Sequence, residues 1–309
     1  MRKLPVIDIS ALEDSAPAAQ QRVGNLLCAA SEDQGFFYIV GHGVDERLLD
    51  GVFDVSKRFF DLSESQKSQV RASGAHRGFL QIGQSTMEGY GGADRKESFI
   101  WGTDKNPSDS NCDSVSALVS VNRWYDGLPE MRDVLNGYFE AIHDVASKLL
   151  AAIAVTMNQP DNYFTQHFSV PTSRGSLIYY PVQIASVDEY GVSPHTDFGC
   201  LSILAQGAPG LRVQSPDGDW FDVEPLENSL VVNVGDLLTR WTNGKFRSVP
   251  HCVINQCSEA RYSVVVFVDP DSQTVIDPIV GYGESRNFEP VTCEAYITQR
   301  FDRSFAYRQ

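Results

Sequence analysis

Short β-forming runs separated by turns fill the second half of this chain of 309 residues. The runs are rich in Val, Ile, Leu, Tyr and Phe, and they lie at 177–180, 201–204, 211–213, 220–223, 229–234, 252–254 and 262–267. Between two of them, the Pro-Asp-Gly-Asp sequence at 216–219 is typical of a hairpin turn. Strands this short and this closely spaced favour a β-sandwich or barrel over a parallel sheet.

The first half of the chain has a different pattern. Apolar residues recur at helical spacing in 17–34, 45–60 and 129–157, and short strands are predicted at 4–9 and 35–40. Residues 73–122 are rich in Gly, Ser, Asp and Asn, which predicts a long loop region. We therefore expect a mainly β fold with flanking α-helices. A helical N-terminal region (1–160) would pack on a β core with a C-terminal helix (161–309), as one compact unit.

Composition narrows the class of protein. The 25 basic and 40 acidic side chains give a net charge of −15, which disfavours nucleic acid and anionic membranes as partners. No uncharged run approaches the roughly 18–20 residues that span a bilayer, and the N-terminus has no apolar signal core. The six cysteines form no C-x-x-C pair, which predicts reduced thiols in a cytoplasmic protein. Oligomeric state is not predicted, although a monomer is compatible with the sequence.

Two histidines and one aspartate form the strongest candidate for a metal site. His195 and Asp197 are two residues apart, so on a strand their side chains would point to the same side. His251 falls beside a second predicted strand and would complete the set across a barrel. Two imidazoles and one carboxylate are the donors of a non-haem Fe(II) centre, which leaves other positions open for small ligands. The same donors with one water also describe a hydrolytic zinc site.

Arg261 and Ser263 follow on the next predicted strand and would share one face of it. A guanidinium fork binds a carboxylate through two hydrogen bonds. A buried arginine requires an anionic partner, which here is either a bound organic acid or one of the 40 acidic side chains. From these two residues alone, the alternatives remain open.

Longer motifs carry a family resemblance. The segments Gly-Phe-Phe-Tyr-Ile-Val-Gly-His-Gly-Val at 35–44 and Gly-Asp-Leu-Leu-Thr-Arg-Trp-Thr-Asn-Gly-Lys-Phe-Arg-Ser-Val-Pro-His at 235–251, with the Arg-x-Ser pair, resemble the isopenicillin N synthase-like family of Fe(II)- and 2-oxoglutarate-dependent oxygenases. The resemblance spans essentially the whole chain. It implies a double-stranded β-helix, or distorted jelly-roll. It also implies catalytic Fe(II) ligands at His195, Asp197 and His251, and a site for 2-oxoglutarate formed by Arg261, Ser263 and Tyr180, with Phe267 lining the substrate pocket.

The chain departs from the family pattern at two positions. Cys252 stands where arginine often follows the distal histidine, and Ile178 stands where many plant members carry asparagine. The Arg-x-Ser pair also occurs in family members that do not use 2-oxoglutarate, so it indicates a carboxylate site without identifying the carboxylate.

The expected activity is the oxidation of a small molecule by O₂, by hydroxylation, desaturation or ring closure, with release of succinate and CO₂ from 2-oxoglutarate. The alternatives are an iron oxidase of the isopenicillin N synthase type that does not use 2-oxoglutarate, and a non-catalytic protein that binds a carboxylate. The sequence does not reveal the substrate.

Overall fold

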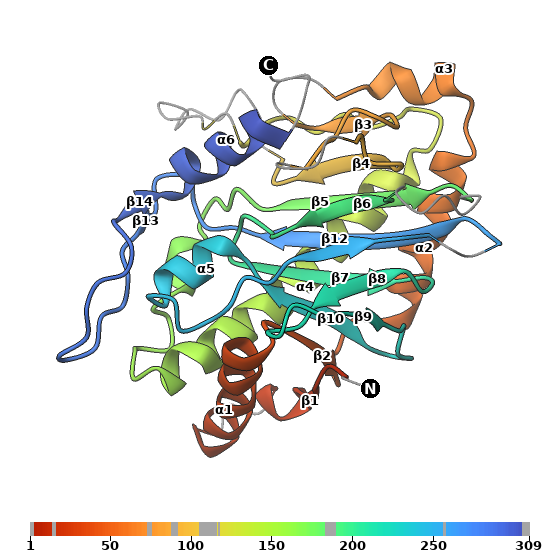
Figure 1. The fold of residues 1–309 in the computed structure, drawn as a ribbon. Helices are drawn as coiled ribbons and strands as arrows, with labels where there is room; N and C mark the ends of the chain where they lie inside the picture. The colour runs from red at the N-terminus through yellow and green to blue at the C-terminus, as the bar shows by residue number, and fades with distance from the viewer. Residues whose placement is uncertain are drawn as a thin grey trace.

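Two β-sheets pack face to face in the computed structural model, which describes residues 3–13, 17–72, 76–87, 92–104, 116, 118–182, 190–255 and 258–304 (Figure 1). The larger sheet has the strand order β1 (Val6–Asp8), β2 (Phe36–Val40), β10 (Leu230–Val234), β7 (Leu201–Gln206), β12 (Arg261–Val268), β5 (Arg174–Tyr180), β4 (Glu97–Gly102) and β3 (Gly78–Leu80). The smaller sheet has the order β6 (Val192–His195), β11 (His251–Val253), β8 (Leu211–Gln214) and β9 (Trp220–Val223). This arrangement confirms the predicted jelly-roll core with flanking helices.

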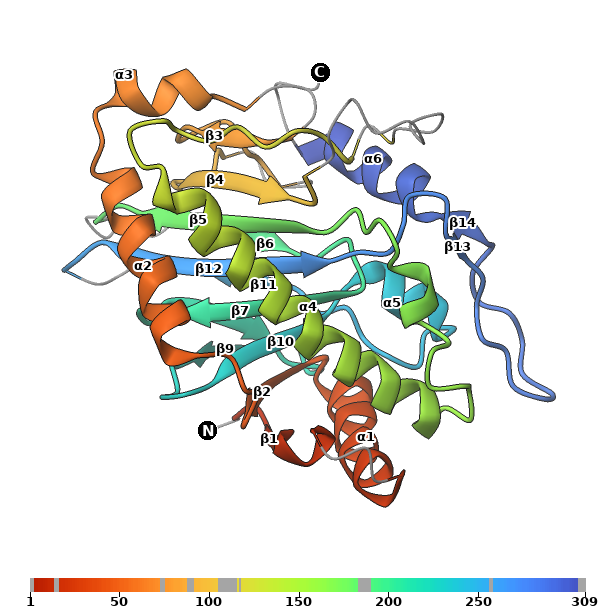
Figure 2. The same ribbon diagram turned by 180° about the vertical axis from the view of Figure 1, so that it is seen from behind.

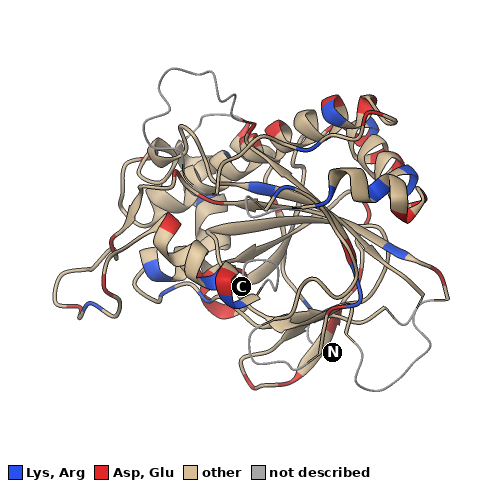
Figure 3. Cartoon of the chain, turned by 90° about the horizontal axis from the view of Figure 1, so that it is seen from above, with Lys and Arg blue, Asp and Glu red and all other residues tan. Residues whose placement is uncertain are grey.

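Helices cover the outer face of the larger sheet. Figure 2 shows α4 (Glu130–Thr156) crossing this face, with α1 (Pro17–Asp33) and α2 (Glu46–Phe60) beside it. The apolar side of α4 packs in one cluster with sheet residues that point outward, among them Leu177, Val264 and Val266. Burial of such side chains contributes about 1.5–3 kcal/mol each. Charged residues of both signs are spread over the helices and loops (Figure 3).

The inner face of the larger sheet meets the smaller sheet. A second apolar cluster joins Tyr180 and Val265 of the larger sheet to Leu211 and Val253 of the smaller one. Because alternate residues of a strand point to opposite faces, β5 and β12 bury side chains on both sides. Their sequences therefore appear as continuous apolar runs rather than alternating ones.

Shorter elements complete the chain. They are α3 (Glu64–Lys67), α5 (Asp236–Trp241), α6 (Cys293–Ser304), the hairpin pair β13 (Val275–Ile276) and β14 (Val291–Thr292), and three 3₁₀ turns at Ser10–Leu12, Ser68–Val70 and Thr165–His167. α6 lies across one end of the two sheets (Figure 1). The β1–β2 pair is parallel, and the other strand pairs in the described residues are antiparallel.

The predicted helices at 17–34, 45–60 and 129–157 are confirmed as α1, α2 and α4. The prediction of a loop region at 73–122 is wrong at β3 and β4, which lie there and extend the larger sheet, while the other described residues of this range lie outside helices and strands. Every residue of β4 is buried, so its sequence lacks the alternation that marks a strand with one exposed face. The N-terminal region thus contributes β1 to β4 to the same sheet as the core.

Two predictions on composition can be compared with the structure. In the residues that it describes, no helix is both long and apolar enough to cross a membrane. The cysteines at 28, 200, 252 and 293 are buried free thiols, as expected, while Cys112 and Cys257 lie outside the described residues.

Candidate metal centre and active site

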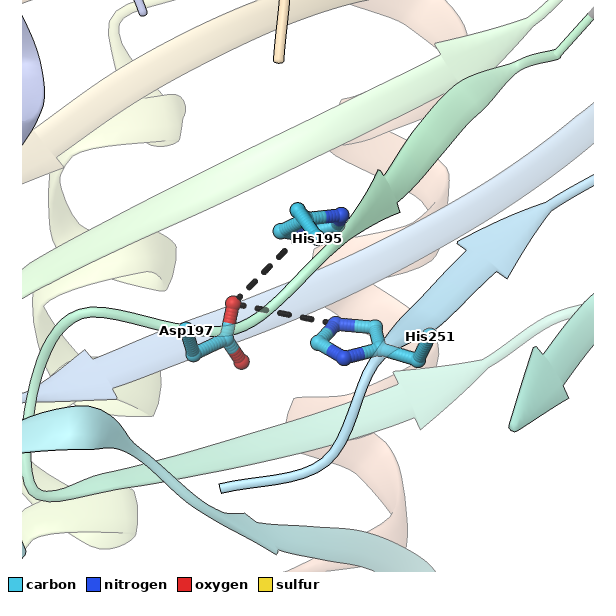
Figure 4. Close-up of side chains that lie close together, drawn as sticks. All are labelled: His195, Asp197 and His251. Atoms are coloured by element: carbon cyan, nitrogen blue, oxygen red, sulfur yellow. Dashed lines mark ion pairs between the residues drawn. The ribbon is translucent and has the colours of Figure 1, made fainter. Parts of the chain in front are cut away.

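His195, Asp197 and His251 converge between the two sheets (Figure 4). His195 ends β6, and it lies directly opposite His251, the first residue of β11, in the antiparallel ladder. Asp197 follows two residues after β6, where the chain leaves the strand. Its Oδ1 atom lies 3.6 Å from Nε2 of His195 and 3.7 Å from Nε2 of His251. The three candidate ligand atoms lie within 4.8 Å of one another, so the structure brings together the residues that the sequence singled out.

Backbone hydrogen bonds set the orientation of both imidazole rings. Nδ1 of His195 lies 2.8 Å from the carbonyl oxygen of Ser193, and Nδ1 of His251 lies 3.2 Å from that of Val249. A carbonyl can only accept, so each Nδ1 carries a proton, and in the neutral form of such a ring Nε2 keeps a lone pair. Those lone pairs are on the nitrogens closest to Asp197. The second ring nitrogen of a metal-bound histidine usually donates in this way.

Asp197 is buried, and its two oxygens have different roles. Oδ2 accepts hydrogen bonds from the Ser202 hydroxyl and from Nδ2 of Asn233, the latter at 2.8 Å, which leaves Oδ1 facing the histidines. Burial alone would raise the pKa of Asp197, but His251, His195 and Ser202 together hold it well below the usual range of a carboxyl. The carboxylate is therefore ionised at every physiological pH.

The convergence of two imidazole lone pairs and one carboxylate oxygen fits a divalent cation. Three electron-rich atoms this close repel one another when nothing positive lies between them, and their burial removes most screening by water. Two nitrogens and one oxygen on one side of an ion suit non-haem Fe(II), with further positions open to small ligands.

The pH dependence of stability follows from the burial of His251. Burial, followed by repulsion from His195, lowers the pKa of His251 to about 4, whereas an unfolded histidine titrates near 6.5. From about pH 6.5 down to pH 4, the unfolded chain therefore binds a proton that the folded chain does not. We expect the free energy of unfolding of the metal-free protein to fall across this window by about 3 kcal/mol more than in His251→Gln. Urea titrations with a chelator at several pH values would measure it, and equal slopes in the two proteins would contradict it.

Gly199, in the turn after Asp197, has no room for a side chain. A Cβ atom there would lie 1.6 Å from Oδ1 of Asp269, a buried carboxylate whose Oδ2 lies 2.9 Å from Nη1 of Arg174. The methyl group added in Gly199→Ala would push Asp269 away from Arg174, and breaking a buried ion pair costs about 3–5 kcal/mol. We expect the midpoint of urea unfolding to drop accordingly. Gly92→Ala is the control, because a Cβ at Gly92 meets no atom within 4 Å. Equal stability of the two variants would refute this account of Gly199.

The metal candidates lie in the wall of a cavity between the sheets, with a volume of about 130 Å³. Arg261, only 1% exposed, lines the same cavity together with Ser263, Tyr180 and Phe267. The Arg261 guanidinium donates from Nη1 to the Ser263 hydroxyl (3.3 Å) and from Nε to the Ala208 carbonyl (3.1 Å). Its Cζ atom lies 4.7 Å from the centre of the Tyr180 ring, directly across the β12–β5 ladder. All seven site residues predicted from the sequence thus border one cavity.

Other residues in the cavity wall were not predicted from the sequence. Arg174 and Phe301 belong to it, as does His76, whose ring centre lies 4.6 Å from that of Phe301. Asn233 falls within the strand predicted at 229–234, and its side-chain amide donates a hydrogen bond to Asp197. An isolated arginine, phenylalanine or asparagine has no pattern of spacing to indicate its role. Ile178, which stands where many plant members of the family carry asparagine, lies opposite Ser263 and gives that part of the cavity an apolar wall.

A jelly-roll that encloses two histidines, one aspartate and a nearby buried arginine defines a class of non-haem iron oxygenases. Comparison with known families specifies the class further. Residues 171–270 match the model of the 2OG-Fe(II) oxygenase superfamily, and residues 4–127 match the model of the N-terminal region of non-haem dioxygenases, described for morphine synthesis.

Relatives of known class align with this chain over nearly its whole length. The chain is 32% identical to the 2-oxoglutarate-dependent dioxygenase citB of Monascus ruber, covering 96% of this chain and 94% of that protein. It is 31% identical to a homoarginine-6-hydroxylase of Glycine max, covering 89% and 88%. The crystal structure of a full-length Neurospora crassa protein in complex with α-ketoglutarate superposes with a TM-score of 0.85 at 26% identity, covering 96% and 95%. The chain belongs to the Fe(II)- and 2-oxoglutarate-dependent oxygenase family. It is an oxidoreductase that uses Fe(II), 2-oxoglutarate and O₂ to oxidise small molecules.

Proposed function

We propose that His195, Asp197 and His251 bind the ferrous ion of this oxygenase, and that Arg261 and Ser263 bind the distal carboxylate of 2-oxoglutarate. The observation that supports this most strongly is the convergence of three candidate ligand atoms within 4.8 Å in the wall of a cavity that also contains a buried guanidinium. The protein would work in the cytoplasm as a single compact unit, since its described cysteines are free thiols.

Iron, 2-oxoglutarate and O₂, when bound, would supply the oxidant for a C–H bond, with succinate and CO₂ as by-products. The protein's own residues place the reactants. The three side chains would supply only three donors to the ion, which would leave its other positions to 2-oxoglutarate and O₂. Ser202 and Asn233 donate hydrogen bonds to the second oxygen of Asp197, so that the first would be held in place to bind the ion.

Arg261 and Ser263 would orient the cosubstrate. The guanidinium provides a fork for the carboxylate, and the hydroxyl beside it donates one further hydrogen bond. The Tyr180 ring packs against the guanidinium and limits its rotation. Ile178, Val265 and Leu204 line the same cavity, and their apolar surfaces would exclude water from the reaction.

An anaerobic titration followed by exposure to air tests this function. We expect the protein with Fe(II) and 2-oxoglutarate to develop a weak visible charge-transfer band, and to form succinate when air is admitted. O₂ consumption without 2-oxoglutarate would instead support an oxidase of the isopenicillin N synthase type. Tight binding of 2-oxoglutarate by metal-free protein, with no turnover under any condition, would support a non-catalytic binder.

A further inference from the structure

A second buried arginine lies in the same cavity, away from the proposed cosubstrate site. Arg174, the first residue of β5, is 5% exposed and lines the cavity. It lies at the end of β5 opposite to Tyr180, whose neighbour across the ladder is Arg261. The cavity therefore has a guanidinium at each end of the β5–β12 pair, and the proposed cosubstrate site accounts for only one of them.

The register of the larger sheet places Arg174 level with the metal candidates. Arg174 pairs with Phe267 of β12, and Phe267 pairs with Ser202 of β7, whose hydroxyl binds Asp197. Arg174 is thus two strands from Ser202, or about 10 Å at the usual strand spacing. Arg261 lies six residues from Phe267 along β12, or about 20 Å at the usual rise per residue. Arg261 is therefore separated from Ser202 mainly along the strands, whereas Arg174 is separated from Ser202 across the strands.

The guanidinium of Arg174 is only partly occupied by protein. Its Nη1 lies 2.9 Å from Oδ2 of Asp269. Within the described residues, Nε and Nη2 have no hydrogen-bond partner, although the side chain is more than nine-tenths buried. Because Arg174 lines the cavity, these two donors are available to an acceptor within it. Nε and Nη2 form one edge of the guanidinium, which donates two parallel hydrogen bonds to an acceptor.

Charge and shape restrict what this edge can accept. Asp269 already balances the charge of Arg174, and Asp94 balances Lys96, which also lines the cavity, with Nζ to Oδ2 at 3.3 Å. A further buried carboxylate would lie close to Asp269 and be repelled by it, whereas a neutral carbonyl oxygen can accept both hydrogen bonds. The rings of Phe267 and Phe301 lie 5.1 and 4.6 Å from Cζ of Arg174. Flat aromatic walls of this kind favour a planar ligand.

We propose that Arg174 is a substrate-binding residue, and that the substrate is a small, uncharged, planar ring compound that presents a carbonyl oxygen to its Nε–Nη2 edge. Arg174 lies two strands, or about 10 Å, from Ser202, whose hydroxyl binds Asp197, and this short spacing favours a substrate of one ring with short substituents. The inference rests on the proposed function, because it assumes that 2-oxoglutarate occupies Arg261.

The test is equilibrium dialysis of the anaerobic enzyme saturated with Fe(II) and 2-oxoglutarate, so that Arg261 is occupied. The probes are benzamide and 2-pyridone, which are neutral rings with a carbonyl oxygen, and benzoate, which has the shape of benzamide with a negative charge. We expect saturable binding of at least one neutral probe, and at least about tenfold weaker binding of benzoate, a difference that corresponds to 1.4 kcal/mol.

The decisive variants are Arg174→Lys, which keeps the charge opposite Asp269 but loses the two-donor edge, and Arg174→Gln with Asp269→Asn, which removes the buried pair as a whole. In both, we expect neutral probes to bind at least about tenfold more weakly, while the charge-transfer band of bound 2-oxoglutarate persists. The control Lys67→Met with Glu97→Gln removes a buried pair that does not line the cavity, and it should bind the probes as the wild type does.

Several results would overturn the inference: neutral probes bound equally by the Arg174 variants and the wild type, a preference for benzoate, or no saturable binding of any probe. Loss of the charge-transfer band in the wild type would instead remove the proposed function itself. The two failures are therefore distinguishable.

Discussion

Replacing Asp197 with asparagine is expected to abolish turnover of 2-oxoglutarate. The substitution keeps the size and shape of the side chain but replaces an anionic oxygen with a neutral amide between two imidazole nitrogens, each less than 4 Å away. Loss of a group that only supports a metal ligand costs about 10–100-fold, so loss of the ligand's charge should cost about 1,000-fold or more in succinate formation. Metal analysis after dialysis should show little retained iron.

Asp222→Asn is the control, because Asp222 is an exposed carboxylate on β9 that pairs with Arg212 outside the cavity. It should retain iron and activity. Circular dichroism would establish that both variants are folded. If Asp197→Asn retained stoichiometric iron and formed succinate at the wild-type rate, the assignment of Asp197 as a ligand would be wrong.

Arg261→Gln is expected to raise the KM for 2-oxoglutarate by about 100-fold. Two hydrogen bonds from a buried guanidinium to a carboxylate are together worth about 3 kcal/mol, which corresponds to about a hundredfold in affinity. The ferrous ion should still bind, because Arg261 contacts none of the three proposed ligands. Initial rates of succinate formation over a range of 2-oxoglutarate concentrations would measure the effect.

Arg261→Lys separates charge from geometry, since it retains a cation but not the planar fork, and its KM should fall between those of the wild type and Arg261→Gln. Arg58→Gln changes an exposed arginine on α2 and should leave the KM unchanged. An unchanged KM for 2-oxoglutarate in Arg261→Gln would mean that Arg261 does not bind the cosubstrate, and the assignment of the cosubstrate site to Arg261 would be wrong.

The sequence predicted those parts of the fold that depend on local pattern. The amphipathic periods of α1, α2 and α4 and the short runs of the β core carry their own signal, because each follows the period of its backbone geometry. The metal candidates were recognisable for a similar reason. His195 and Asp197 lie close together in the chain, and the resemblance to a known family pointed to His251.

The features of the fold and site that the sequence did not predict depend on contacts between distant parts of the chain. β4 is an interior strand of the larger sheet with charged residues just before it, and nothing local indicates that it pairs with β5. α5 has only six residues, too few for a helical period to be recognised. The partner of Arg174 is 95 positions away, and Phe301 reaches the cavity from the C-terminal helix. Tertiary packing alone determines these roles.

Both halves of the chain contribute strands to the larger sheet, so the chain cannot be cut between them without disrupting that sheet. A fragment restricted to 161–309 would lose β2 and β4, and would thereby uncover the hydrogen-bonding edges of β10 and β5. Open edges of this kind recruit strands from other molecules, so such a fragment is expected to aggregate on expression. It would also lack Phe36 and Lys96, which line the cavity, and therefore even a refolded sample would lack part of the cavity wall.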